Sequence, residues 1–414
     1  MINYMRNNKL KIDRRTFISK TAAVSAGFVL AGNRLDVFAS DKDSPTVPKR
    51  KLGKTGIEIS TLGLGGEFNF LDNQIILRKA YDAGAIFWDT APFYGGGNSE
   101  LGIGKFLEKK PDTRKNVLLC TKGSRAKDIK DADRIFHESL QRMKTDYVDL
   151  YCGVHGLGKI DQLTDDMKSW AENAKAKGLI KAFGFSAHGN MTENLTEATK
   201  LGWVDFVMTS YNFRLMQDDE INRSIEACYK AGIGVIAMKT QGHSPGKYVD
   251  ANQELESQAD KKVVDHFLKA GFNEGQAKIK AVLKNPFISC ACVACNNISI
   301  LNSNIEAVKE PAKLAESDIN ALKEYAETTC RSYCIGCGQC EKIFPEIPYI
   351  ADTMRFLMYH DSYGETARAK QLFSQIPSDI KAKMTKINYR PAEKTCPQNL
   401  PITQIIAQAI KRLS

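Results

Sequence analysis

Eight short apolar runs, each ending in polar residues or glycine and followed by a helix-like stretch, recur between Arg50 and about Leu322. Near-continuous apolar strands that alternate with helices are typical of parallel strands covered on both faces. Eight such units predict an α/β fold of the (β/α)8 TIM-barrel type. An open doubly wound sheet is the alternative, but no Gly-x-Gly-x-x-Gly follows the first run. The runs are 60–64, 85–89, 117–121, 147–152, 180–185, 206–209, 234–238 and 288–293.

Polar residues follow most of these runs, where the carboxyl ends of barrel strands carry the chemistry. Because the carboxyl ends of all strands meet at one barrel mouth, we expect these side chains to lie near one another. In chain order they are Asp89 with Tyr94, Lys122, His155, Ser186 with His188, Tyr211 with Asn212, and Lys239.

Four motifs in this series resemble the aldo/keto reductases, in the order and at the strands where that family has them. They are WDTAPFYG at 88–95, Thr121-Lys122, Val154-His155 and GFS at 184–186. The stretch RKLGKTG at 50–56 also resembles the family's hairpin across the barrel floor. The resemblance implies a barrel domain over 49–325 that transfers hydride between a nicotinamide cofactor and a carbonyl or alcohol substrate. Polar loops after the strands are compatible with sugars as substrates.

Asp89, Tyr94, Lys122 and His155 suit the proton transfer that such a reaction needs. Tyr94 is the candidate acid/base, but a free tyrosine has a pKa of about 10 and needs a partner that favours the phenolate. Lys122 supplies a positive charge that Asp89 can orient. His155 can donate a hydrogen bond to the substrate oxygen as negative charge grows on it. The resemblance assigns the same roles to these positions.

The cofactor residues are assigned through the resemblance. It implies that Tyr211 stacks on the nicotinamide ring and that Ser186 and Asn212 lie near its carboxamide. The segment 295–299, which contains Asn297, and the later Asn304 lie where relatives hold the adenosine phosphate. The sequence departs there from the pattern that places a basic side chain beside a 2′-phosphate, and Lys239 alone does not decide. NAD and NADP therefore both stay open.

The cysteines near the carboxyl terminus predict a metal cluster. Cys334-x2-Cys337-x2-Cys340 resembles the iron–sulfur run of bacterial ferredoxins, with Phe344 in place of the fourth cysteine and Pro345 after it. In two-cluster ferredoxins the fourth ligand of a cluster comes from the other run, which assigns Cys396, before Pro397, to this cluster. The second cluster would then be lost, since its four ligand positions hold Phe344, Lys386, Tyr389 and Ala392.

We therefore expect one 4Fe–4S cluster in a helical, ferredoxin-like module over 326–414. Four thiolates would also suit zinc, and two disulfides are a further alternative. The run Cys290-x-Cys292-x2-Cys295 lies on the eighth predicted strand and is interpreted as core packing.

Residues 1–39 predict an export signal. A basic stretch ends in Arg14-Arg15-Thr16-Phe17, a short apolar run follows, and Val37-Phe38-Ala39 resembles a cleavage site. This resembles a twin-arginine signal, which carries folded, cofactor-loaded proteins, and it predicts a periplasmic location. A retained basic helix on a cytoplasmic enzyme is the alternative. Residues 40–48 are interpreted as a linker.

The composition limits the partners. Of the formal net charge of +10, +5 lies in residues 1–39, and the remaining charges alternate in sign, so no nucleic-acid partner is expected. No stretch reaches the roughly 20 apolar residues of a membrane span, so no integral membrane segment is expected.

Two functional hypotheses follow. The first is an exported aldo/keto reductase whose cluster relays electrons to a redox partner protein, or which alternates two substrates on one retained nicotinamide. The second is a non-catalytic binding or regulatory barrel whose cluster is only structural.

Overall fold

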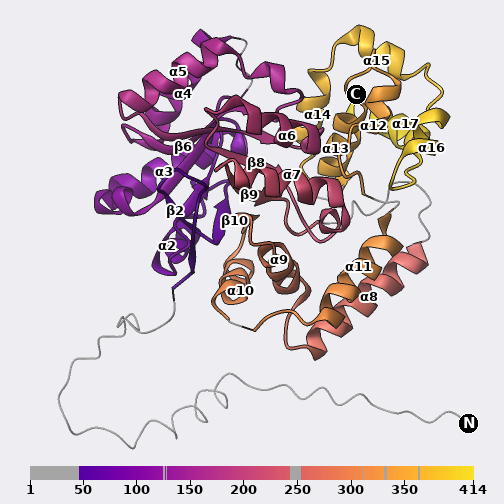
Figure 1. The fold of residues 1–414 in the computed structure, drawn as a ribbon, viewed down its shortest axis with the longest axis horizontal. Coiled ribbons are helices and arrows are strands. Elements are labelled where there is room, and N and C mark those ends of the chain that lie inside the picture. Colours follow the sequence, from indigo (N-terminus) through magenta and orange to yellow (C-terminus); the bar gives the residue numbers. More distant parts are fainter. Residues whose placement is uncertain are drawn as a thin grey trace, which may run out of the picture. The chain divides into compact units, whose positions relative to one another are not determined.

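Eight parallel strands close into a barrel in the order β10-β3-β4-β5-β6-β7-β8-β9 (Figure 1). Each strand pairs in parallel with both neighbours, which confirms the (β/α)8 prediction. The strands are β3 (Leu62–Gly65), β4 (Phe87–Asp89), β5 (Leu118–Lys122), β6 (Val148–His155), β7 (Ile180–Ala187), β8 (Phe206–Ser210), β9 (Gly234–Met238) and β10 (Ile288–Ala294).

The computed structural model describes residues 46–124, 126, 128–242, 253–310, 312–330, 333–361 and 364–414. The predicted export signal and the predicted linker up to residue 45 lie outside this part of the chain. Residues 46–414 form one compact unit. No helix within the described ranges is long and apolar enough to cross a membrane.

A two-stranded antiparallel hairpin precedes the barrel, formed by β1 (Lys49–Lys51) and β2 (Glu58–Ser60). Leu52 and Ile59 of this hairpin are fully buried in the same apolar cluster as Phe87, Phe206 and Ile236 of the strands. Burial of these side chains removes apolar surface from water at one end of the barrel interior. The hairpin therefore closes the end opposite the strands' carboxyl ends.

Amphipathic helices cover the outside of the barrel. In α4 (Ile129–Met143), Ala132, Ile135, Phe136 and Leu140 recur at helical spacing and are buried, while Asp128 caps the first turn. The other helices of this part are α2 (Gln74–Asp82), α3 (Asn98–Lys109), α5 (Asp165–Ala176), α6 (Met191–Leu201), α7 (Asp219–Lys230), α8 (Gln253–Lys269), α9 (Glu274–Lys284), α10 (Ile298–Lys309) and α11 (Glu316–Thr328).

The carboxyl-terminal residues form a helical module with its own apolar cluster, which includes Ile350, Leu357, Tyr389 and Ile405. The described part of this module contains no strand. Its helices are α12 (Gln339–Ile343), α13 (Ile350–Asp361), α14 (Thr366–Ser374), α15 (Ser378–Met384), α16 (Arg390–Thr395) and α17 (Ile402–Leu413).

The module is bound to the carboxyl ends of the barrel strands. Asn190 after β7 donates its backbone N–H to the carbonyl of Gly336 at 2.9 Å. A Cβ atom at Gly336 would lie 2.3 Å from the carbonyl oxygen of His188, so only glycine permits this approach. Lys239 after β9 donates from Nζ to the Tyr359 hydroxyl of α13 at 3.0 Å. The module thus lies against the end of the barrel where chemistry is expected.

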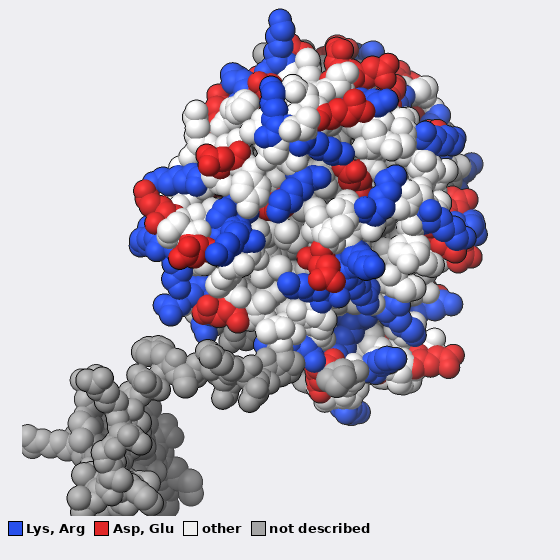
Figure 2. Space-filling view, turned by 60° about the vertical axis from the view of Figure 1, so that its left-hand side comes forward, with Lys and Arg blue, Asp and Glu red and all other residues white. Residues whose placement is uncertain are grey.

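Charges on the surface alternate in sign. On the face drawn in Figure 2, Lys and Arg side chains are interspersed with Asp and Glu side chains. This arrangement agrees with the interleaved charges of the sequence after residue 39.

Candidate active site at the barrel mouth

Three neighbouring strands bring the predicted catalytic residues together. Asp89, Lys122 and His155 are the last residues of β4, β5 and β6, and Tyr94 begins the 3-10 turn η1 (Tyr94–Gly97) after β4. Lys122 forms an ion pair with Asp89 and donates to the Thr90 carbonyl oxygen at 2.9 Å. The Lys122 Nζ also lies 4.8 Å from the centroid of the Tyr94 ring. The four side chains therefore share one place at the barrel mouth.

The Asp89–Lys122 pair is buried, with 1% of the lysine side chain exposed. Burial raises the pKa of Asp89, and the Lys122 ammonium opposes this rise. Burial alone would lower the pKa of Lys122, but the Asp89 carboxylate outweighs it, so the net shift is upward. Each charge thus depends on the other, and Lys122 stays protonated.

His155 ends β6, which is separated from β4 by β5, and it faces Tyr94. Its Nε2 lies 3.5 Å from the Tyr94 hydroxyl, and its Nδ1 lies 2.7 Å from the Ser124 hydroxyl. The Phe93 ring stacks on the imidazole at a centroid distance of 5.2 Å. A separation of 3.5 Å is long for a hydrogen bond, and catalytic hydrogen bonds without ligand are often long. Ser124 was not predicted, although its place two residues after Lys122 was a usable signal.

The Tyr94 hydroxyl holds its proton more tightly than a free tyrosine does. Burial raises its pKa well above 10, and the Asp89 charge and Tyr359 add to the rise. The Lys122 ammonium, which we expect to favour the phenolate, is paired with Asp89. In the protein without a ligand the neutral phenol is therefore the favoured form.

Three predicted cofactor residues lie at the same mouth. Ser186 pairs in register with His155, and its hydroxyl accepts a hydrogen bond from the Gly156 N–H at 3.0 Å. The Asn212 amide donates to the Lys239 carbonyl oxygen at 3.1 Å and to the Tyr333 hydroxyl at 3.2 Å. Lys239 reaches the module through Tyr359, as described above. Module side chains thus cover two of these residues.

The other three predicted cofactor residues make structural contacts away from the tetrad. The Tyr211 ring is buried in the core, and its hydroxyl donates to Asn222 Oδ1 at 2.8 Å. Asn297 caps α10 by accepting from the Ile300 N–H. Asn304 is buried and donates to the Cys295 sulfur at 3.2 Å. Their roles in cofactor binding stay predictions.

The four predicted metal ligands line one pocket in the module. Cys334, Cys337, Cys340 and Cys396 surround it together with apolar residues such as Met354. All eleven cysteines are free thiols. No group of three or more His, Cys, Asp or Glu side chains among the described residues has a geometry that could hold a metal ion. The thiols therefore share a pocket without converging on one point.

The positions assigned to a lost second cluster are filled mainly by packing. Tyr389 and Ala392 are buried in the module's apolar cluster, and Phe344 packs against it. The Phe344 and Tyr389 rings lie 5.8 Å apart, while Lys386 is exposed. The run Cys290, Cys292 and Cys295 is buried at β10 and its end, in agreement with its interpretation as core.

A second pocket connects the barrel mouth with the first predicted metal ligand. His188, Ser210 and Lys239 line it from the strand ends, and Cys334 and Arg355 line it from the module. His188 is buried, and its Nδ1 has no hydrogen-bond partner among the described residues. Burial lowers the pKa of His188, and Arg355 and Lys239 lower it further, so the imidazole is neutral. This pocket places polar groups between the two candidate redox sites.

The module also brings a cation to the tetrad. Arg368 of α14 forms an ion pair with Glu67, which follows β3, and its guanidinium carbon lies 5.8 Å from the centroid of the Tyr94 ring. No motif pointed to Arg368, because its position depends on how the module packs on the barrel.

Comparisons with known proteins agree with the geometry of this mouth. Residues 56–327 match the model of the aldo/keto reductase family. The chain is 28% identical over 303 residues to an L-galactose dehydrogenase of Arabidopsis thaliana, covering 66% of this chain and 94% of the relative.

Two bacterial proteins are similar as well. An uncharacterized oxidoreductase of Bacillus subtilis is 25% identical over 67% of this chain and 96% of its own length. A D-threo-aldose 1-dehydrogenase of a Pseudomonas species is 27% identical over 44% of this chain and 66% of its own length. The family match spans more than half of the sequence and contains all four residues of the tetrad, so the chain belongs to the aldo/keto reductase family.

Proposed function

We propose that this oxidoreductase transfers hydride between a nicotinamide nucleotide and a carbonyl or alcohol substrate, with Tyr94 as acid/base. The observation that carries the proposal is the convergence of three strand ends. They place the Tyr94 hydroxyl 3.5 Å from His155 Nε2 and the Asp89–Lys122 pair beside the tyrosine ring.

Each residue of the tetrad has a role in this proton transfer. In reduction, Tyr94 and His155 donate hydrogen bonds to the carbonyl oxygen, and Tyr94 gives up its proton as that oxygen becomes an alkoxide. The bound nucleotide supplies the hydride. In oxidation, Tyr94 takes the proton of the alcohol, and the nearby Lys122 ammonium stabilises the phenolate that must form first. Asp89 keeps that ammonium charged and oriented.

Part of the mouth fits a nicotinamide. Ser186 offers a hydroxyl next to His155, and Lys239 offers a cation after β9. Asn212 has its amide engaged by Lys239 and Tyr333, and it could contact a ligand only after Tyr333 moves.

Sugars are the substrate class that we favour. The printed activities of two relatives, an L-galactose dehydrogenase and a D-threo-aldose 1-dehydrogenase, both concern sugars. Polar side chains at the mouth, including Glu67 and Arg368, suit a hydroxyl-rich ligand.

The test is Tyr94→Phe, which removes the acidic proton and keeps the ring. We expect turnover of reduced nicotinamide with carbonyl substrates to fall roughly 10²- to 10⁴-fold. The control is Tyr229→Phe, because Tyr229 is 54% exposed on α7. Nucleotide binding, measured by fluorescence quenching, should survive in both variants. Wild-type protein that binds ligands without turnover would instead support a non-catalytic binding or regulatory barrel.

We further propose that Cys334, Cys337, Cys340 and Cys396 hold one 4Fe–4S cluster. Four thiols around one pocket are the donor set that such a cluster needs. The cluster would supply one-electron chemistry beside the barrel mouth.

Iron and sulfide analysis of anaerobically purified protein, with its visible spectrum, tests the cluster. Cys396→Ser should lose the iron, whereas Cys330→Ser should keep it, because Cys330 does not line the pocket. A zinc-loaded protein without iron would contradict the proposal. A cluster that never changes oxidation state during turnover would exclude the relay to a redox partner protein and leave a structural role.

The twin-arginine signal leads to a proposal about location. We propose that the protein is exported to the periplasm with its nicotinamide already bound. An enzyme that retains its nicotinamide does not depend on a pool of free cofactor in the periplasm. Sequencing the amino terminus of the mature chain tests the export. Mass spectrometry of nucleotide released from protein purified from the periplasm tests the retention.

A further inference from the structure

Arg368 reaches the reaction centre from outside the barrel. Its guanidinium carbon lies 5.8 Å from the Tyr94 ring, 5.9 Å from the Phe93 ring and 4.5 Å from the Tyr359 ring. The side chain is 19% exposed. A cation enclosed by the acid/base tyrosine and two other aromatic rings is therefore a part of the mouth.

Two carboxylates hold the guanidinium in this place. Its NH1 group pairs with Glu67 from the barrel and with Glu365 of the module, the latter at 2.7 Å. Burial raises the pKa of Glu365 to about 7, and Lys239 opposes this rise. Both the barrel and the module thus contribute to one polar cluster.

The two carboxylates do not use every polar atom of this cation. The Nε atom of Arg368 is buried and has no hydrogen-bond partner among the described residues. A buried donor without a partner destabilises the fold, and such exceptions call for an explanation. A substrate oxygen that draws the guanidinium toward Tyr94, 5.8 Å from its ring centroid, provides one.

We infer that Arg368 is a specificity-determining residue of the module. It binds the oxygen substituent on the carbon next to the reacting carbonyl or alcohol carbon. The neighbouring carboxylates, Glu67 and Glu365, accept hydrogen bonds from further hydroxyls of the same substrate. The inference rests on the proposed function, and it makes the module a part of the substrate site as well as the carrier of the cysteines.

The experiment removes the Arg368 guanidinium and the substrate hydroxyl that it is proposed to bind, separately and together. Full-length protein is assayed with L-galactose and 2-deoxy-L-galactose, and with D-glucose and 2-deoxy-D-glucose. The variant is Arg368→Met. Its matched control is Arg412→Met, because Arg412 pairs with Asp361 on the same module, is 41% exposed, and does not contact the tetrad. Arg368→Lys keeps the charge without the planar fork.

Wild-type protein should prefer the hydroxylated member of at least one pair by roughly 10-fold or more in kcat/KM. Arg368→Met should lower kcat/KM for that sugar by about 10- to 100-fold, as expected for a hydrogen bond to a charged group, and should lose the preference. Arg368→Lys should lie between, and Arg412→Met should match wild type. Thermal melting shows whether each variant is folded.

The other outcomes each have a definite meaning. An equal loss for both members of a pair, with the preference retained, would show that Arg368 only anchors the module. Wild-type turnover of simple carbonyls such as 9,10-phenanthrenequinone without any preference for hydroxylated sugars would overturn this inference and leave the proposed function standing. Absence of nicotinamide-dependent turnover with every carbonyl would contradict the proposed function, and the inference with it.

Discussion

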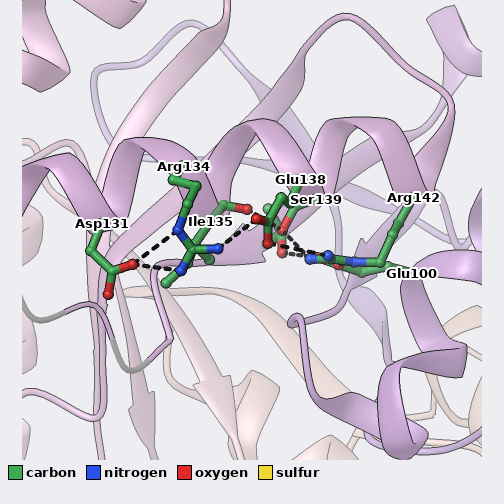
Figure 3. Close-up of polar contacts among 8 residues, drawn as sticks. Glu100, Asp131, Arg134, Ile135, Glu138, Ser139 and Arg142 are labelled. Atoms are coloured by element: carbon green, nitrogen blue, oxygen red, sulfur yellow. Dashed lines mark hydrogen bonds and ion pairs between the residues drawn. The ribbon is translucent and has the colours of Figure 1, made fainter.

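A buried carboxylate behind the catalytic strand β5 makes the stability of the barrel testable with one pair of variants. Glu100 has a fully buried side chain that accepts from the Thr121 hydroxyl at 2.6 Å and from Arg142 Nε at 2.7 Å (Figure 3). Arg142 is 26% exposed and also donates to Ser139 at 3.0 Å. Because Thr121 directly precedes Lys122, this pair supports the strand end that carries Lys122.

Arg142→Met leaves the Glu100 carboxylate buried with one neutral partner. Removing one member of a buried pair destabilises by about 3–5 kcal/mol, and the partial exposure of Arg142 favours the lower end, near 3 kcal/mol. For a unit of this size that corresponds to a fall in Tm of roughly 4 °C. Glu100→Gln in the same chain should restore most of the loss, because it removes the unpaired charge.

Thermal melting followed by circular dichroism measures these shifts. Arg134→Met is the matched control, since Arg134 lies on the same helix α4 and pairs with Asp131 and Glu138 (Figure 3). Its side chain is 58% exposed, so no measurable change in Tm is expected. Equal Tm values for the Arg142 and Arg134 variants would refute the reasoning that burial, rather than the number of ion pairs, sets the stabilisation.

Three further predictions concern the mouth and the module. Lys122→Met leaves Asp89 buried without its ammonium and raises the pKa of that carboxyl further. The folded state then binds more protons than the unfolded state, so the loss of Tm relative to wild type should grow as the pH rises from about 5 to 8. Burial holds the pKa of Tyr94 well above 10, so kcat/KM for reduction should stay flat with respect to this group between about pH 6 and 9. In the same range kcat/KM for oxidation should rise with pH. A fall of kcat/KM for oxidation with rising pH would contradict this prediction. Gly336→Ala places a Cβ atom against the His188 carbonyl oxygen at a backbone φ of +69°, so it should weaken the contact between the module and the barrel. Limited proteolysis after Thr328 should then be faster than in wild type. An unchanged cleavage rate would contradict this prediction.

The barrel and its catalytic end could be predicted because both follow from periodic patterns. Continuous apolar runs predicted the eight strands, and the observed strands lie within a few residues of the predicted runs. The rule that carboxyl ends of parallel strands meet predicted that polar residues there lie together, and the resemblance to the aldo/keto reductases selected the tetrad among them. Lys122 and His155 are the last residues of their strands, which places them at this end.

The strand-end rule does not fix how side chains beyond the strand ends are oriented. Tyr211 follows β8, yet its hydroxyl turns to Asn222 of α7, because side-chain direction in a loop depends on the local backbone and the neighbouring helix. Asn297 and Asn304 were selected by position, whereas a helix cap and a buried sulfur satisfy them. Arg368 had no signal, since the docking of the module arises from complementary surfaces that no periodicity encodes.

Docking of the module has a consequence for the exchange of the cofactor. The groups at the mouth that could hold a nucleotide are engaged by tyrosines of the module, Asn212 by Tyr333 and Lys239 by Tyr359. Arg368 pairs with Glu67 beside them and joins the barrel to α14. We therefore expect a nucleotide that binds Lys239 to compete with contacts of the module and to exchange slowly. An arrangement that slows exchange is a disadvantage for an enzyme that recycles free nicotinamide, and an advantage for one that is loaded once and then exported, which ties the proposed location to the contacts at the mouth.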